Sequence, residues 1–254
     1  MVDYMTKAFI SVNNLVKTYY SKAEELTVIR GTSFEINKGE VVCLLGTSGS
    51  GKTTTLNILA GIDKPTSGEI CYGGQDISKW PIDSLYDYRL SEIGFIFQEF
   101  YLLEHLTALE NVMVPMLLSG VNEEIAKNIA LQLLSQVGLK GKTMNHPEEL
   151  SSGEKQRVCV SRAIANSPSI LIADEPTGTL DSKTGDAIMQ LLLNIARENN
   201  MTMIYTTHDP YLTSLASRIF VIQKGIVAET EISNLAELDY NNIVFESKGG
   251  KNQK

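Results

Sequence analysis

The chain has 254 residues, of which 43% are hydrophobic and 20% charged, and this composition excludes a disordered, collagen-like or coiled-coil protein. Its length fits one large domain, or one domain with an added lobe. The formal net charge of −8 argues against nucleic acid and anionic membrane surfaces as partners, because both are themselves negative.

The cysteines and the apolar runs restrict where the protein can work. No C-x-x-C spacing joins Cys43, Cys71 and Cys159, so we expect neither a zinc site nor a disulfide framework, and a reducing compartment. The first 14 residues lack the long apolar core of a signal peptide. The longest apolar runs are far below the ~20 residues that cross a bilayer, so we expect a soluble chain that relies on another protein to span any membrane.

Short β-like segments occupy the first part of the chain and recur later. Phe34 and Ile36 alternate with polar neighbours, as in a half-exposed strand. Continuously apolar runs are typical of strands buried on both faces of a parallel sheet, and four such runs occur: Val41–Leu45, Ile93–Phe97, Ile170–Ala173 and Met201–Tyr205.

Between the second and third of these runs the apolar period changes to that of helices. Thr107-x-x-Glu110 and Ser151-x-x-Glu154 match the capping box. Asn122 is expected to begin a helix that ends near Gly138, with one apolar face: Ile125, Ile129, Leu133 and Val137. We predict an all-helical lobe over about residues 99–167, inserted in an α/β core over about residues 1–98 and 168–230. Residues 1–246 then form one domain, and residues 247–254 a disordered tail.

A phosphate-binding loop follows the first buried run. The segment matches G-x-x-x-x-G-K-[ST] and comprises Gly46, Thr47, Ser48, Gly49, Ser50, Gly51, Lys52 and Thr53. Its glycines let the backbone wrap a phosphate, and its N–H groups add to the positive end of the following helix. Lys52 is expected to reach the β and γ phosphates and Thr53 to ligate Mg²⁺. The segment predicts ATP binding.

Polar residues follow three other buried runs. Asp174 and Glu175 come after Ile170–Ala173, where Asp174 would hold Mg²⁺ through water and Glu175 would act as general base toward the attacking water. Gln98 and His208 come after the other two runs. Because open parallel sheets bind ligands at the carboxyl ends of their strands, we expect all of these groups to converge with the phosphate-binding loop.

In this order the motifs resemble the nucleotide-binding subunit of ABC transporters, from about Phe9 to Ala228. The resemblance implies a P-loop core with a mostly parallel sheet, an N-terminal antiparallel β subdomain and an inserted helical lobe. It also implies Gln98 as a catalytic and magnesium contact, His208 as the switch histidine, and a homodimer that closes over two ATPs. The remaining implied nucleotide contacts are Tyr19, with Tyr20 as its rival, Thr54, and, across the dimer, Ser151, Gly153, Glu154 and Asp181.

A finer resemblance is to the subgroup of lipoprotein-release and macrolide-export ATPases, which also contains antimicrobial-peptide resistance systems. It rests on Ile93–Gln98, on Leu102–Pro115, and on Asp63-Lys-Pro-Thr-Ser-Gly68. It implies integral membrane permease subunits as partners and a cytoplasmic location on the inner face of the membrane. An ATPase that only transmits force, or acts in cell division, through its membrane partner remains an alternative.

Two departures and one ambiguity remain. The usual signature of the family reads Leu-Ser-Gly-Gly-Gln, whereas Ser152 and Glu154 replace its first Gly and its Gln here. The Cβ of Ser152 is expected to lower turnover without removing the site. The apolar segment Phe100–Leu106 either packs inside the helical lobe or forms a groove for a helix of a partner. A non-hydrolytic scaffold is disfavoured because Lys52 and Glu175 are both present.

Overall fold

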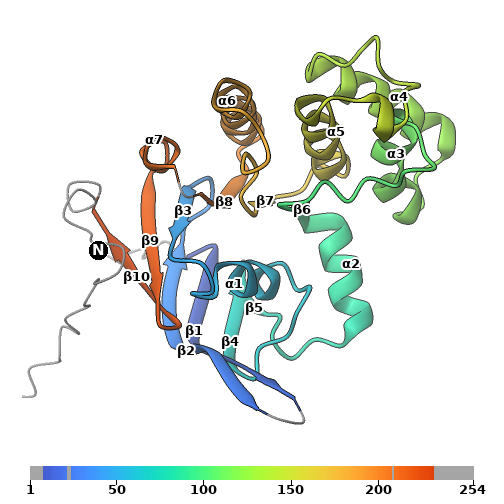
Figure 1. The fold of residues 1–254 in the computed structure, drawn as a ribbon. Helices are drawn as coiled ribbons and strands as arrows, with labels where there is room; N and C mark the ends of the chain where they lie inside the picture. The colour runs from blue at the N-terminus through green and yellow to red at the C-terminus, as the bar shows by residue number, and fades with distance from the viewer. Residues whose placement is uncertain (1–7, 22–23, 208, 232–254) are drawn as a thin grey trace, which may run out of the picture.

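The computed structural model of the chain describes residues 8–21, 24–207 and 209–231, which form two sheets and a group of helices (Figure 1). The smaller sheet is antiparallel with strand order β2-β1-β4-β5. Its strands are β1 (Ile10–Tyr20), β2 (Glu25–Ile36), β4 (Ser67–Tyr72) and β5 (Gln75–Asp76). This is the expected N-terminal antiparallel subdomain.

The larger sheet has the order β10-β9-β3-β8-β7-β6, and β10 is its only antiparallel strand among the described residues. Its strands are β3 (Val41–Leu45), β6 (Ile93–Ile96), β7 (Ile170–Ala173), β8 (Thr202–Thr206), β9 (Arg218–Gln223) and β10 (Ile226–Thr230). The four continuously apolar runs are therefore adjacent or near-adjacent strands of one mostly parallel sheet. The predicted fold class is confirmed.

The parallel sheet separates two hydrophobic cores. In β3, the side chains of Val42 and Leu44 enter one core with α1 (Lys52–Leu59), α2 (Ile82–Glu92) and the antiparallel sheet. Those of Cys43 and Leu45 enter the other core with α6 (Ser182–Glu198) and the helices that follow β6. Both faces of each central strand are covered, which explains why these strands carry no polar alternation.

The helices between β6 and β7 are α3 (Ala108–Leu118), α4 (Glu123–Gln136), the 3-10 turn η1 (Pro147–Glu149) and α5 (Ser152–Ile164). They form a helical region beside the sheets, in green and yellow in Figure 1. Thr107 and Ser151 begin α3 and α5 with the predicted capping boxes. Helix α2, which precedes β6, was not predicted, because it buries only Leu85 and Tyr88 and has no clear apolar stripe. A last short helix, α7 (Pro210–Thr213), follows β8.

The predicted apolar face of α4 is confirmed in part, because Val137 is buried and Ile129 and Leu133 pack against the core. The buried residues within α4 itself are Ala126, Ala130 and Leu134, whereas Ile125 is 54% exposed. The two alanines let α4 pack closely against its neighbours, which large side chains on that face would prevent. The predicted end is right: Gly138 has a φ of +80°, and the N–H of Leu139 donates to the Leu134 carbonyl at 2.7 Å.

No helix of the described ranges is long and apolar enough to cross a bilayer. The expected tail, residues 247–254, lies outside the described residues.

Candidate nucleotide-binding site

The predicted phosphate-binding loop connects β3 to α1, so it leaves the carboxyl end of a central strand and enters a helix N-terminus. Gly49 and Gly51 have φ values of +75° and +109°, which favour glycine. A Cβ on Gly46 would lie 2.7 Å from the Ile222 carbonyl oxygen. Thr47 and Ser48 are exposed. The buried Ser50 hydroxyl has no hydrogen-bond partner among the described residues. The loop is a backbone cradle open to solvent on one side.

The Lys52 side chain folds back onto this loop and binds two of its carbonyl groups. Its ammonium group donates to the carbonyl oxygens of Gly46 at 2.9 Å and Thr47 at 3.2 Å, and the side chain is buried. Burial lowers the pKa of Lys52, and the carboxylates of Glu175 and Asp174 partly offset that shift. A buried cation held only by carbonyl oxygens is suited to a polyanionic ligand, whereas the two nearby carboxylates suit a cation that accompanies it.

Asp174 lies at the end of β7, opposite the start of α1. Its carboxylate accepts hydrogen bonds from the hydroxyls of Thr53 at 2.6 Å and Thr206 at 2.7 Å. Its backbone N–H donates to the Ile96 carbonyl in the neighbouring strand. The structure thus brings the predicted Thr53 and Asp174 oxygens into direct contact. Thr206, at the end of β8, was missed because a single threonine after an apolar run carries no recognisable motif.

Glu175 leaves the strand in a strained conformation, with a φ of +46°. Its N–H donates to the Thr206 hydroxyl at 2.8 Å, so one threonine positions both acidic residues. The Glu175 side chain lines a pocket of about 380 Å³ together with Asp181 and Thr207. This pocket joins the end of β7 to the start of α6.

Gln98 follows β6 and is exposed. It lies two residues after Ile96, whose carbonyl accepts from the Asp174 N–H. The segment after it is tied to α5 by Arg162, whose guanidinium donates to the carbonyl oxygens of Tyr101 at 2.6 Å and Phe100 at 2.8 Å. Arg162 was not predicted as a site residue. His208, the expected switch histidine, lies outside the described residues.

The apolar segment Phe100–Leu106 is partly buried in the helical region and partly exposed. Leu102 is buried in the core and Phe100 packs against it, whereas Tyr101 and Leu103 are 66% and 41% exposed. The segment is therefore packed into the helical region and still presents apolar side chains to solvent.

The expected signature residues lie at the start of α5, which is well separated from α1 (Figure 1). The Glu154 carboxylate accepts from the Ser151 N–H at 2.8 Å and from the Ser151 hydroxyl at 2.9 Å, and the first of these bonds does most to hold the pKa of Glu154 below its usual value. A Cβ on Gly153 would lie 2.7 Å from the Thr184 methyl group in α6, so packing requires that glycine. Ser152 is exposed and makes no such approach.

Helix α5 also contacts the acidic loop. Gln156 is buried, and its amide donates to the Pro176 carbonyl at 2.7 Å, one residue after Glu175. Asp181 caps α6 by accepting from the Thr184 N–H at 3.1 Å. The start of α5, the start of α6 and the segment after β7 therefore form one connected group.

Tyr19 and Tyr20 differ in how the fold holds them. The Tyr19 hydroxyl donates to the Asp63 carboxylate at 2.8 Å and also interacts with the Thr54 side chain in α1. The Lys17 ammonium lies 4.7 Å from the Tyr19 ring and 2.6 Å from Asp63. Tyr19 is 41% exposed and Tyr20 71% exposed. Tyr19 is thus the ring that is held beside the start of α1.

The geometry is that of a nucleotide-binding cassette. The sequence model of the family described as "ABC transporter" matches residues 29–178 of this chain. The chain belongs to the ABC transporter family. It is 40% identical to the lipoprotein-releasing system ATP-binding protein LolD of Idiomarina loihiensis over 88% of this chain and 98% of the relative. It is 41% identical to the macrolide export ATP-binding/permease protein MacB of Syntrophobacter fumaroxidans over 86% of this chain and 31% of that longer protein.

A solved ABC cassette has the same fold. The dimeric structure of MJ0796 in a post-hydrolysis state with ADP and Pi has a TM-score of 0.82 and 38% identity, and the match covers 88% of this chain and 98% of that one. The predicted resemblance to the ABC family, and to its lipoprotein-release and macrolide-export subgroup, is confirmed. The chain is an ATP-binding, ATP-hydrolysing subunit of the ABC type, and the solved cassette that it resembles is a dimer.

Proposed function

We propose that the chain hydrolyses ATP with Lys52, Asp174 and Glu175, and that it drives membrane permease subunits of the lipoprotein-release or macrolide-export type. The observation that carries the proposal is the contact of Thr53 with Asp174 beside the phosphate-binding loop, with Glu175 next along the chain. The names LolD and MacB, at about 40% identity, support the class of complex.

The residues present suit a magnesium nucleotide. Mg²⁺ prefers one or two carboxylates with oxygens from phosphate and water, and Asp174 and Thr53 offer a carboxylate and a hydroxyl at one point. Gln98 is a further proposed ligand. When bound, the ion neutralises phosphate charge. Lys52 and the N–H groups of the loop would hold the phosphates, together with Thr54 in the first turn of α1.

Glu175 is the proposed general base. Its backbone is fixed by Thr206, and its side chain faces the pocket that it shares with Asp181. The carboxylate orients the attacking water and accepts its proton. Gln98 and His208 are proposed to contact the water and the γ-phosphate.

The start of α5 is proposed to serve the ATP of a second copy. It is remote from α1 of its own chain, and dimeric cassettes are its structural neighbours. Ser151, Gly153, Glu154 and Asp181 would then meet the partner's nucleotide, while Tyr19 stacks on the adenine within the same chain.

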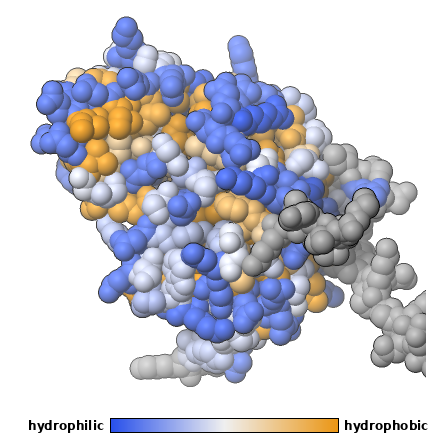
Figure 2. All heavy atoms as spheres, turned by 180° about the vertical axis from the view of Figure 1, so that it is seen from behind, coloured by the Kyte–Doolittle hydropathy of each residue, from blue (hydrophilic) through white to orange (hydrophobic). Residues whose placement is uncertain are grey.

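The membrane partner is proposed to dock on the helical region. A groove of about 220 Å³ there includes Ile93, Phe95, Val114 and Leu118. Figure 2 shows hydrophobic surface gathered at its upper left, the side on which the helical region lies after the turn. The exposed apolar side chains of this region include Leu103, Leu117 and Ile125. Such a site would place the chain on the inner face of the cell membrane.

One experiment tests the proposed membrane partner and its docking site. The chain is purified from its native cell through a tag in mild detergent, and co-purifying membrane proteins are identified with wild-type protein and with Leu118→Glu. We expect a permease-type protein with the wild type and its loss with the variant, while Mg²⁺-dependent ATPase activity of the isolated variant is unchanged. Purification without any membrane protein, or equal capture by Leu118→Glu, would contradict the docking proposal.

A further inference from the structure

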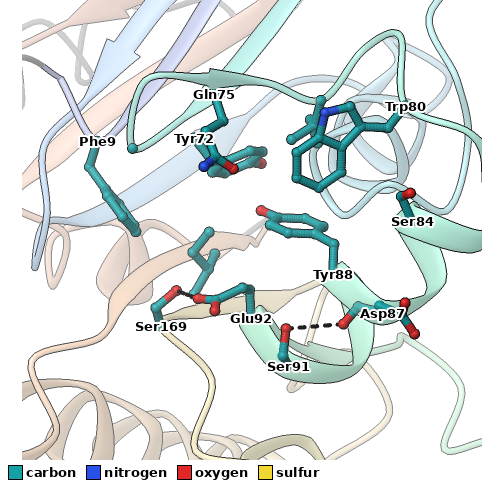
Figure 3. A pocket seen from close by; sticks show the side chains of 13 residues that line it. Phe9, Tyr72, Gln75, Trp80, Ser84, Asp87, Tyr88, Ser91, Glu92 and Ser169 are labelled. Atoms are coloured by element: carbon teal, nitrogen blue, oxygen red, sulfur yellow. Dashed lines mark hydrogen bonds between the residues drawn. The ribbon is translucent and has the colours of Figure 1, made fainter.

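A second pocket lies at the opposite edge of the parallel sheet from the phosphate-binding loop. It has a volume of about 450 Å³, within the range of small-molecule sites, and Figure 3 shows the side chains that line it. Ser169 and Ile170 lie at the start of β7, whereas Asp174 follows its end. The four residues of β7 separate the two sites by about 13 Å. The pocket is therefore distinct from the nucleotide site.

Aromatic rings form the walls of this pocket. The Tyr88 ring faces Tyr72 and Trp80 (Figure 3), with centroid separations of 5.3 Å and 6.0 Å. Phe9 lines the other side. Its ring already attracts a cation, because the Lys38 ammonium lies 5.9 Å from its centroid. Aromatic faces carry negative potential and attract ammonium or guanidinium groups within about 6 Å.

The charged residues that line the pocket are acidic, and Lys38 lies outside the lining, beside Phe9. Asp87 and Glu92 line the pocket, and no Lys or Arg belongs to its lining among the described residues. The Glu92 carboxylate accepts from the Ser169 hydroxyl at 2.6 Å, which holds this exposed side chain beside the start of β7 (Figure 3). Burial raises the pKa of Tyr88, and Tyr72 and then the Glu92 charge add smaller contributions.

The Tyr88 hydroxyl is buried and makes no hydrogen bond of normal geometry within the described part of the chain. Buried polar atoms without a partner are rare in folded proteins. An apolar wall with an unsatisfied hydroxyl and a fixed carboxylate is more typical of a binding site than of a packing defect.

We propose that this pocket binds an organic monocation with an apolar body. The cationic group would lie against the rings of Tyr72 and Tyr88 with Glu92 as its counter-charge, and the apolar body would contact Trp80 and Ile77. Anions are disfavoured by the two carboxylates, and a neutral ligand would lack the attraction of the ring faces.

The test uses the tryptophan of the pocket, which is the single one in the chain. The full chain is titrated with benzyltrimethylammonium, with neutral benzyl alcohol and with benzenesulfonate, and Trp80 fluorescence is recorded. We expect a saturable change with the cation, binding roughly tenfold weaker for the neutral probe, and none for the anion. Excess Mg-ATP should not displace the cation, because the sites are separate.

Matched variants identify the counter-charge. Glu92→Gln should weaken cation binding by about two- to fivefold, because Glu92 is exposed, whereas Ser169→Ala, which loses the same hydrogen bond and keeps the charge, should change it little. Glu123→Gln, an exposed acid in α4, serves as the control for surface charge. Thermal melts check that each variant is folded. Equal binding of cation and benzyl alcohol, equal weakening by Glu123→Gln, or the lack of a saturable signal would each overturn the proposal.

Discussion

Asp174 depends on two threonine hydroxyls, and Thr206 is the one that also fixes Glu175. Thr206→Val keeps the shape and removes both contacts. The Asp174 carboxylate then keeps only its side-chain bond from Thr53, and the N–H of Glu175 loses its acceptor. We expect Mg²⁺-dependent ATPase activity to fall roughly tenfold or more, with a stability loss of about 1–3 kcal/mol.

The control for Thr206 is another buried threonine with two hydrogen bonds far from the site. Thr32→Val breaks the contacts of Thr32 with Val227 between β2 and β10. It should lower the free energy of unfolding by a similar amount and leave kcat nearly unchanged. Parallel loss of kcat in the two variants would mean that the effect of Thr206→Val is only structural.

Lys52 is the second residue whose environment predicts a measurable loss. Lys52→Ala removes a buried cation that two carboxylates attract, and ATP binding should weaken by about 1.5–3 kcal/mol, or ten- to a hundredfold. Hydrolysis should be abolished, because the transition state carries more charge at the γ-phosphate. Nucleotide binding by calorimetry and phosphate release check this, with Lys127→Ala in α4 as control. Near wild-type ATPase activity in Lys52→Ala would contradict the assigned role.

At the scale of the element, the start of α5 depends on its capping box. Ser151→Ala should lower the free energy of unfolding by about 1 kcal/mol, because the N-cap oxygen that accepts from Glu154 is lost. Ser135→Ala, at an exposed position inside α4, should cost nothing measurable. Chemical denaturation of both variants checks the prediction, and equal stability losses would contradict it.

The same box predicts a pH dependence. The Ser151 N–H, and to a smaller extent its hydroxyl, lower the pKa of Glu154 in the folded state. The ionised Glu154 therefore contributes fully to the free energy of unfolding above its ordinary pKa of 4.5. This contribution is lost as the pH falls through the lowered folded value. Glu154→Gln should therefore lose less stability than the wild type on acidification from pH 6. A steeper loss in Glu154→Gln would show that the carboxylate is not the stabilising group.

Ser152 and Gly153 are neighbours in α5 with different constraints. Gly153 is required by the approach of Thr184, whereas the exposed Ser152 is not constrained within the chain. Ser152→Gly should therefore keep or raise ATP turnover, and Gly153→Ala should lower both stability and turnover. Steady-state ATPase assays of the two variants check this. A collapse of turnover in a folded Ser152→Gly protein would show that the signature needs the serine hydroxyl.

For the whole molecule, the separation of α1 from the start of α5 predicts that catalysis needs two copies. Glu175→Gln keeps the shape of the site and removes the base, so hydrolysis should slow by roughly a hundredfold or more. Nucleotide-bound dimers should then accumulate, as size-exclusion chromatography with ATP can measure. The wild type with ADP should elute mostly as a monomer.

The double variant Lys52→Ala/Glu175→Gln provides the control for this dimer. It should stay monomeric, because it cannot hold the ATP that joins the two copies. A Glu175→Gln protein that binds ATP and remains monomeric would show that the isolated chain needs its membrane partner to dimerise.

Local patterns in the sequence were sufficient for four strands of the parallel sheet, the phosphate-binding loop and the acidic pair, but not for β9, β10 or the strand order. A strand buried on both faces must be continuously apolar, and a loop that wraps phosphate must contain glycine, so both carry their structure in adjacent residues. The capping boxes of α3 and α5 are equally local. These features determined the family and the class of reaction before any contact was known.

The tertiary structure decided what depends on contacts between distant segments. The packing of α4 selects its inward face, which buries Ala126, Ala130 and Leu134 and leaves the predicted Ile125 exposed. Thr206 and Arg162 gained their roles from partners 32 and about 60 residues away. The aromatic pocket likewise joins β4, α2 and the start of β7. Such contacts produce no periodicity or motif in the sequence, because neither residue of a pair carries a recognisable signal on its own.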